Sequence, residues 1–405
     1  MMIQSIQQSL GLISRKFGRC KSAVCCAMAL MGSAVWTGQV QAQDTFMLAV
    51  IGDQQVPTKG TTYYPSFTAQ TDWLADNAKD QNLRFVTQVG DIIEHGDSTA
   101  EWDRALAAMT KLDTAANADG GTGVPWNVAF GNHEVNWGAS GADPAGAKAD
   151  NYRAYFGSSD GTKAHRYAGQ ASFGGVSSND LNTYHIIKSS DASDAREYLM
   201  LNLEYDVPGH AAGSNPGAGD TPAFDAIQWA QGVIDEHEGM PTIITTHVFE
   251  GTKHGPPGNP YTTGAGRNSQ LEIFDKLIKD NSQVFMVFSG HTSQDSHQIK
   301  LNAEGKKVLQ MVTDYNKVLL NGGNGFMRLI ELDETSGEIR VKTFSPGVPQ
   351  SPEEKYITDD DGQFTVEIDW DERFGSAPEP GSLGLLGCGS LMLLRRPHFK
   401  PVCIL

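Results

Sequence analysis

Short apolar segments recur along the chain, and a polar motif follows each of them. Five of these segments are β-like, because they carry no charge and are rich in Val, Ile and Phe. They cover residues 48–51, 85–89, 126–130, 243–246 and 284–288. Between the second and the third, Trp102, Leu106 and Met109 recur at helical spacing. The pattern therefore predicts an α/β fold in which strands alternate with helices.

The remaining hydrophobic pattern divides the chain into an alternating part and a strand-rich part. Helices are predicted over residues 67–79, 100–112, 223–237 and 271–278. Three further β-like segments follow one another towards the C-terminus, at 307–312, 326–332 and 339–344. Alternating units followed by successive strands suit a two-sheet β-sandwich with helices on its outer faces.

The polar motifs at the strand ends carry the chemistry of metal ligands. In order, they are Asp53-Gln54-Gln55, Gly90-Asp91, Gly131-Asn132-His133-Glu134, His247 and Gly290-His291. Strand ends of an α/β sheet face one crevice, so these distant residues are expected to converge there. Asp, Asn and His side chains are typical ligands of divalent transition metals. Each residue alone could be a turn residue or a buried histidine with satisfied hydrogen bonds, but the fixed order of all five motifs favours a metal site.

The series resembles the calcineurin-like metallophosphoesterase superfamily, over roughly residues 45–345. The resemblance implies the αββα fold of that family, which is a two-sheet sandwich flanked by helices. It also implies hydrolysis of phosphomonoesters or phosphodiesters by a metal-activated water. One or two divalent ions, Mn, Fe, Zn or Mg, are the expected cofactors.

The resemblance implies a role for each motif residue. Asp91 corresponds to the carboxylate that bridges two metal ions, and Asp53 to a ligand of the second ion. His133 corresponds to a histidine that binds no metal and protonates the leaving-group oxygen, and Glu94 to an acidic residue that orients this histidine. The remaining ligands of the first ion would be Asn132, His247 and His291.

Two positions depart from the family pattern. The family usually has Asp-x-His in the first motif and Gly-His-x-His in the last, whereas Gln55 and Ser293 stand in place of the two final histidines here. Both missing histidines belong to the second metal, so that site would keep Asp53, Asp91 and the amide oxygen of Gln55. A harder ion such as Mg²⁺ or Mn²⁺, or no ion at all, is expected there.

Several residues are candidates for contact with the substrate. His95 stands where protein phosphatases of the family carry a phosphate-binding Arg, and His254 lies in a Gly/Pro-rich loop. Arg267 and Arg328 are alternatives for phosphate binding. Residues 314–316 follow a strand after the last motif and are expected to border the pocket. Its walls would come from three long Gly-, Ala-, Ser- and Pro-rich stretches, 136–182, 206–221 and 250–268.

The two ends of the chain are expected to be sorting signals. Residues 1–42 are interpreted as a secretory signal peptide, because basic residues precede the apolar stretch 22–35 and an A-x-A-like cleavage site. Pro378-Glu379-Pro380, the apolar run 383–394 and an Arg-Arg pair resemble the PEP-CTERM sorting signal of exported bacterial proteins. That resemblance implies an exosortase-type processing enzyme as a partner, and a membrane contact only through the terminal segments.

These assignments divide the chain into four parts. They are a signal peptide (1–42), a phosphoesterase domain (43–345), a C-terminal extension or spacer (346–377) and a sorting tail (378–405). All five cysteines lie in the terminal segments, so the body has no thiol nucleophile and no Cys-ligated zinc. We expect an exported protein of the bacterial cell envelope or the extracellular space.

Charge limits the range of partners. The formal net charge is −17, from 31 basic and 48 acidic residues. Such a chain should repel nucleic acid, so the expected substrates are small-molecule or protein phosphoesters. The alternative hypothesis is a catalytically impaired binding or extracellular matrix protein with the calcineurin fold, which Gln55 and Ser293 favour. The survival of His133, Asn132 and Asp91 favours an enzyme.

Overall fold

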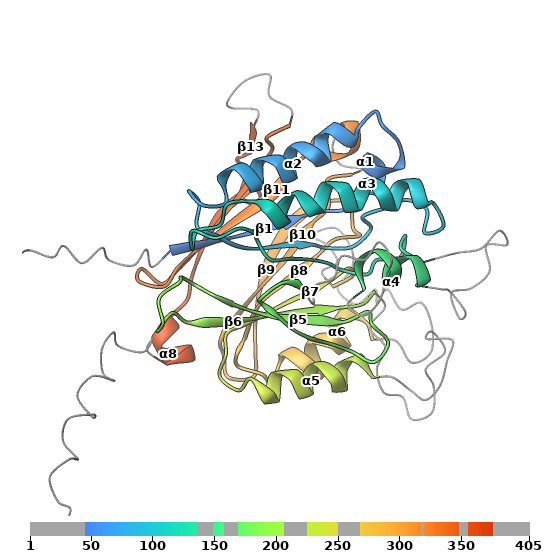
Figure 1. Ribbon diagram of the computed structural model, residues 1–405. Coiled ribbons are helices and arrows are strands. Elements are labelled where there is room, and N and C mark those ends of the chain that lie inside the picture. The colour runs from blue at the N-terminus through green and yellow to red at the C-terminus, as the bar shows by residue number, and fades with distance from the viewer. Residues whose placement is uncertain are drawn as a thin grey trace, which may run out of the picture. The chain divides into compact units, whose positions relative to one another are not determined.

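Two mixed β-sheets pack face to face with helices on their outer faces, in the computed structural model of the protein (Figure 1). The structure describes residues 45–135, 149–157, 169–205, 225–249, 268–316, 320–347 and 355–375. Each sheet has seven strands. The predicted fold class, a two-sheet α/β sandwich flanked by helices, is confirmed.

The first sheet is centred on β1, which pairs in parallel with β2 and antiparallel with β11. Its path runs β13-β12-β11-β1-β2-β3, and β14 also pairs with β12. The bounds are β1 Thr45–Ile51, β2 Leu83–Gln88, β3 Trp126–Val128, β11 Met327–Asp333, β12 Glu338–Phe344, β13 Tyr356–Ile357 and β14 Gln363–Glu367.

The second sheet has the order β4-β5-β6-β7-β8-β10-β9. Its central strands β6, β7, β8 and β10 are parallel to one another. Of these, β7, β8 and β10 lie at predicted β-like segments, whereas β6 was not predicted. The bounds are β4 Phe173–Val176, β5 Thr183–Lys188, β6 Glu197–Leu203, β7 Thr242–Thr246, β8 Val284–Ser289, β9 Asp295–Leu301 and β10 Lys307–Thr313.

Helices cover both outer faces, and the four predicted helices are all present. In Figure 1, α2 and α3 lie over the first sheet, and α5 and α6 over the second. The bounds are α1 Gln55–Lys59, α2 Tyr64–Asn77, α3 Thr99–Met109 with the 3-10 turn η1 Thr110–Thr114, α4 Asp150–Phe156, α5 Ala226–Glu236, α6 Gln270–Ile273 with the π-helical turn η3 Phe274–Ile278, α7 Leu320–Gly323 and α8 Trp370–Phe374.

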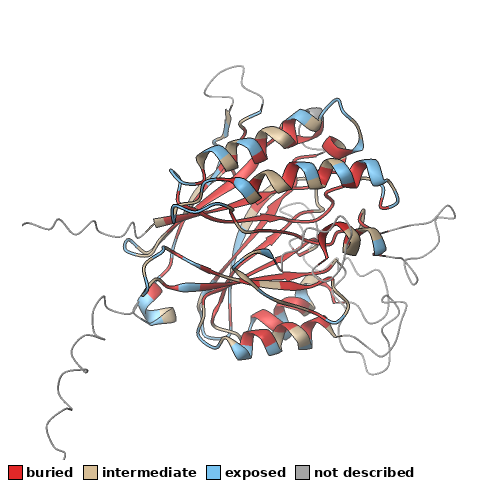
Figure 2. Ribbon diagram, viewed as in Figure 1, coloured by how far each residue is buried: buried red, intermediate tan, exposed pale blue. Residues whose placement is uncertain are grey.

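The core consists of three apolar layers. Along β1, Leu48 and Val50 face the layer between the sheets, whereas Ala49 and Ile51 face the layer beneath α2 and α3. A third layer joins the second sheet to α5 and η3. Figure 2 shows the strands largely buried and the outer helix faces exposed. Because both faces of the central strands are covered, their sequences read as continuous apolar runs.

The predicted C-terminal extension, 346–377, includes described residues that belong to the folded body. β13 and β14 extend the first sheet through β12. Val366, Ile368 and Trp370 are buried in the layer between the sheets. Asp369 caps α8 by accepting a hydrogen bond from the backbone N–H of Glu372. Residues 355–375 are therefore built into the sandwich.

Of the other sequence-based assignments, some fall on described residues and others do not. The stretch 136–182, expected to be a loop, contains α4 and β4 among its described residues. The predicted signal peptide, the sorting tail and most of the three expected pocket walls lie outside the described residues. No helix in the described part of the chain is long and apolar enough to cross a bilayer.

Candidate metal centre

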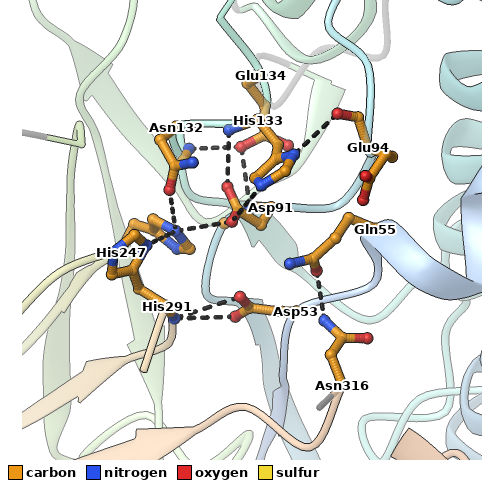
Figure 3. Close-up of polar contacts among 12 residues, drawn as sticks. Asp53, Gln55, Asp91, Glu94, Asn132, His133, Glu134, His247, His291 and Asn316 are labelled. Carbon is orange, nitrogen blue, oxygen red and sulfur yellow. Dashed lines mark hydrogen bonds and ion pairs between the residues drawn. The ribbon is translucent and has the colours of Figure 1, made fainter. Parts of the chain in front are cut away.

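The five motifs converge at one end of the sandwich, where strands from both sheets finish. Asp53, Asp91 and Asn132 follow β1, β2 and β3 of the first sheet. His247 and His291 follow β7 and β8 of the second sheet. Figure 3 shows these side chains pointing toward one another. The predicted convergence at the strand ends is therefore present.

Three potential ligand atoms gather around the Nε2 atom of His247, which is itself a potential ligand. This atom lies 3.1 Å from Oδ2 of Asp91 and 3.1 Å from Oδ1 of Asn132. It also lies 3.2 Å from Nδ1 of His291. Among the residues that the structure describes, Asp91, His247 and His291 form a group of acidic and histidine residues whose ligand atoms all lie within 4.8 Å of one another.

The tautomer of His247 suits a ligand role. Its Nδ1 lies 2.9 Å from the carbonyl oxygen of Val89, which can only accept a hydrogen bond. Nδ1 therefore carries the proton, and the lone pair of Nε2 points into the cluster. Carboxylate, amide and imidazole donors gather in one cluster, in which Asp91 and His247 are buried and His291 is partly buried, and this donor set fits a divalent cation of the Mn, Fe or Zn type.

The charged residues of the same cluster shift one another's pKa values. Burial acts against the charged form of His247, but Asp91 and Glu134 outweigh it and raise the pKa of the imidazole. Burial also acts to raise the pKa of Asp91, but His247 and His133 outweigh it, so the pKa of this carboxyl is lowered. Asp91 is thus held in the ionised form that a metal ligand requires.

The backbone at the ligands adopts a conformation that most residues avoid. Asp91 and His291 have φ values of 52° and 70°, in the left-handed region. Gly90 has a φ of 100°, and a Cβ there would lie 2.6 Å from Nδ1 of His247. Such strain persists only where the surroundings enforce it, and it is concentrated at functional sites.

Glu134 holds the two ligand loops together, a role that sequence reasoning did not assign. Its side chain is buried and accepts hydrogen bonds from the backbone N–H groups of Asp91 (2.9 Å), Ile92 (2.8 Å) and Gly131 (2.5 Å). Burial, and then the charge of Asp91, raises the pKa of Glu134 to about 7. The signal available in the sequence was its place directly after the Asn-His pair.

His133 is fixed beside the cluster. Its backbone N–H donates to Oδ1 of Asp91 at 2.9 Å, and its Nε2 lies 3.8 Å from Oδ2 of the same carboxylate. Its Nδ1 lies 2.8 Å from the carbonyl oxygen of Glu94. The orienting group is therefore the main-chain carbonyl of Glu94 and not its carboxylate, which instead pairs with Lys59 at 3.2 Å.

The region expected to hold the second metal is rich in oxygen donors. Both carboxylate oxygens of Asp53 lie 3.3 Å from the backbone N–H of His291. Burial, and then the charges of Asp314 and Asp91, raises the pKa of Asp53 well above its ordinary value. The amide oxygen of Gln55 accepts a hydrogen bond from the side chain of Asn316.

The candidates for substrate contact are placed differently. His95 has a half-exposed side chain whose Nδ1 lies 2.8 Å from the carboxylate of buried Glu101. Arg328 is fully buried and donates to the carbonyl oxygen of Asp361, so it cannot reach a substrate. His254 and Arg267 lie outside the described residues.

Comparison with known proteins gave a family match and a distant relative. The family model described as calcineurin-like phosphoesterase matches residues 46–295. A relative from Bacillus subtilis, described as uncharacterized protein YvnB, is 27% identical over 346 residues. The match covers 82% of this chain but 22% of the relative, so the chain spans about a fifth of that protein.

Several solved structures are similar at low identity. Purple acid phosphatase PPD1 from yellow lupin matches 82% of this chain and 55% of its own, with a TM-score of 0.45 and 12% identity. GAP50, described as the anchor in the inner membrane complex of Plasmodium, matches 80% of this chain and 88% of its own, with a TM-score of 0.41 and 11% identity. TT1561 of Thermus thermophilus matches 75% of this chain and 99% of its own, with a TM-score of 0.37 and 11% identity.

Proposed function

Because the chain belongs to the calcineurin-like phosphoesterase family, we propose that it hydrolyses phosphomonoesters or phosphodiesters with the help of bound divalent cations. The observation that supports this most directly is the convergence of Asp91, Asn132 and His291 on Nε2 of His247. A cation bound there would activate a water molecule and neutralise developing charge on the phosphoryl oxygens.

The ligand residues are pre-positioned for this task. Asp91 is fixed at its backbone by Glu134 and at its side chain by the N–H of His133. His247 presents a lone pair because its other nitrogen donates to Val89. A site that needs no rearrangement on binding keeps the reacting groups aligned, which is the main requirement of phosphoryl transfer.

The position of His133 supports its role as the general acid. Since Nδ1 donates to the carbonyl of Glu94, Nε2 is the nitrogen that faces Asp91 and the cluster. In the imidazolium form, the Nε2–H group would give its proton to the leaving-group oxygen as the P–O bond breaks. Positioned proton transfer of this kind typically contributes about 10²–10⁴-fold to a rate.

The alternative function is a binding or matrix protein with an impaired metal site. It is favoured by the second-site region, where the amide oxygen of Gln55 is engaged by Asn316. Asp53 also lies outside the ligand cluster of Asp91, His247 and His291. The fixed orientation of His133 favours the enzyme, because a binding site does not require an aligned proton donor.

The test compares wild-type protein with His133→Ala in assays with p-nitrophenyl phosphate and its bis-ester. His237→Ala, which removes an imidazole just after α5, is the matched control. We expect the His133 variant to lose about 10²–10⁴-fold in kcat while its metal content, measured by elemental analysis, stays at the wild-type level. Unchanged turnover would rule out the assigned acid, and a wild type with neither bound metal nor turnover would favour the binding protein.

We also propose export, on the basis of the sequence patterns at residues 1–42 and 378–396. The partners would be a small-molecule or protein phosphoester and an exosortase-type processing enzyme. N-terminal sequencing of protein from cell envelope and medium fractions should give Gln43 as the first residue. Full-length protein confined to the cytoplasm would contradict this proposal.

A further inference from the structure

The loop after β2 is held by two buried carboxylates. The backbone N–H groups of residues 91–95 all donate to one or the other of them. Glu134 accepts from the first three residues. Glu101 accepts from the last two, Glu94 at 2.8 Å and His95 at 2.9 Å, both on Oε2. The end of the loop that carries the metal ligand and the end that follows it therefore have separate anchors.

The peptide group between Glu94 and His95 lies between Glu101 and His133. In a trans peptide group the C=O and N–H bonds point in opposite directions. Here the N–H end donates to Oε2 of Glu101, and the C=O end lies 2.8 Å from Nδ1 of His133 (Figure 3). One rigid group therefore links the carboxylate to the imidazole. Hydrogen bonds arranged in such a chain polarise and strengthen one another.

We propose that Glu101 is a positioning residue for the general acid. It holds the peptide group between Glu94 and His95 so that the carbonyl oxygen of this group fixes the ring of His133. The inference rests on the proposed function, because it takes His133 as the group that gives its proton to the leaving-group oxygen. It assigns the positioning role to α3, an element that contributes no residue to the cluster of acidic and histidine ligands.

Glu101 is itself fixed in place. Its side chain is buried in the first turn of α3, where the helix end favours a negative charge. Its second oxygen, Oε1, lies 2.8 Å from Nδ1 of His95, so both carboxylate oxygens are engaged. A buried carboxylate is costly unless hydrogen bonds compensate for the lost water. These three hydrogen bonds all come from Glu94 and His95, so the carboxylate is committed to this part of the loop.

The next residue of the loop is held by other side chains. The carbonyl oxygen of Gly96 accepts hydrogen bonds from Nε1 of Trp102 on α3 and from Nδ2 of Asn151 on α4, both at 2.8 Å. These contacts remain when Glu101 is replaced. The loop should therefore stay attached to both helices, and the change should be confined to the peptide group that His133 uses.

Three substitutions of Glu101 separate the position of its oxygens from their charge. Glu101→Ala removes the acceptor and leaves the N–H groups of Glu94 and His95 without it. Glu101→Gln keeps an oxygen where Oε2 stands but carries no charge. Glu101→Asp keeps the charge but withdraws it by one methylene group. If the residue acts through position, the Gln variant should behave like the wild type and the other two should not.

The first measurement observes the imidazole of His133 directly. NMR spectra of the histidine ring nitrogens are recorded on full-length, chelator-stripped protein that carries isotope-labelled histidine, and His133→Gln identifies the signal. We expect neutral His133 to be in the Nδ1–H tautomer in the wild type and in Glu101→Gln, because the carbonyl of Glu94 accepts that proton. Glu101→Ala and Glu101→Asp should show a mixture of both tautomers. This measurement needs neither metal nor turnover.

The second measurement compares leaving groups. The kcat values for p-nitrophenyl phosphate and phenyl phosphate, or for the corresponding diesters, are determined in parallel. Phenolate needs more help from an acid than p-nitrophenolate, so a misplaced acid should affect the phenyl ester most. We expect Glu101→Ala and Glu101→Asp to lose about 10–100-fold with the phenyl ester and clearly less with the p-nitrophenyl ester. A smaller folded fraction would lower both rates equally.

The matched control is Asn302→Ala, which removes a side-chain oxygen that accepts two backbone N–H groups in the turn between β9 and β10. It should leave the ratio of the two rates unchanged. A single His133 tautomer in both Glu101→Ala and Glu101→Asp overturns the inference, as does an unchanged ratio of rates in these variants, or a Gln variant that behaves like Ala. Glu101→Asp decides if the Ala variant does not fold. A wild type without turnover contradicts the proposed function instead, and the tautomer measurement then decides alone whether Glu101 positions the imidazole.

Discussion

Replacement of Glu134 by Gln tests how the fold aligns the metal ligands. The carboxylate accepts four backbone hydrogen bonds: Oε2 accepts from Asp91 and Gly131, and Oε1 accepts from Ile92 and, at 3.4 Å, from Ile93. An amide oxygen in place of Oε2 can keep the first two. The new NH₂ group then faces the N–H groups of Ile92 and Ile93, so that at least two buried donors lack an acceptor.

The expected cost follows from these contacts. Each unsatisfied buried donor costs about 1–3 kcal/mol, so the free energy of unfolding should fall by about 2–6 kcal/mol. Asp91 belongs to the clamped segment itself, and it has a left-handed backbone that needs external support. Loss of a group that orients a ligand typically weakens metal binding about 10–100-fold. Both effects should appear in the same variant.

The assay pairs urea denaturation of chelator-stripped protein with a competition measurement of metal affinity. Glu101→Gln is the matched control, because Glu101 also clamps backbone N–H groups, those of Glu94 and His95, but touches no metal ligand. It should lose stability without losing metal affinity. If Glu134→Gln loses stability and yet binds metal as tightly as the wild type, the clamp does not align the ligands and the reasoning is wrong.

Three further predictions concern stability. Burial lowers the pKa of His185 from 6.5 to about 3, so its contribution is complete above pH 6.5 and is lost as the pH falls toward 3. Between these limits the unfolding free energy of wild type should fall by up to about 1.4 kcal/mol per pH unit more than that of His185→Phe; parallel urea-denaturation profiles of the two proteins would contradict this. Chelator should lower the melting temperature measured by scanning calorimetry, since ion at 100 times its Kd stabilises by about 2.7 kcal/mol; an unchanged value would mean that no ion is bound. Trp370→Ala should cost about 3–5 kcal/mol, because the indole packs against Phe285 and Tyr198; a loss below about 1 kcal/mol in urea denaturation would show that residues 355–375 are not part of the core.

Much of the fold was readable from the sequence. Strands buried on both faces are largely apolar along their whole length, so segments such as 85–89 and 284–288 can be recognised as strands from the sequence. Parallel strands with helical connections must end at one edge, so the ligand motifs could be expected to meet there. The fold and the convergence of Asp91, His247 and His291 followed from these local rules.

Other features depended on contacts that no local pattern encodes. Glu94 orients His133 through its carbonyl because of the path of the main chain, which the identity of its side chain does not reveal. Arg328 lies between the sheets because its strand alternation places it on the inner face. Residues 355–375 join the sheet because β12 offers them an edge.

The surroundings of the altered metal position were decided in the same way. Gln55 and Ser293 stand where the family pattern has two histidines, but nothing in their sequence neighbourhood indicated which residues contact them. Asn316 and Asp314 reach these positions from the end of β10, in one case across 261 residues. Periodicity reports which face of an element is buried. Which side chains meet across elements depends on how the two sheets stack, and only the packed structure fixes that.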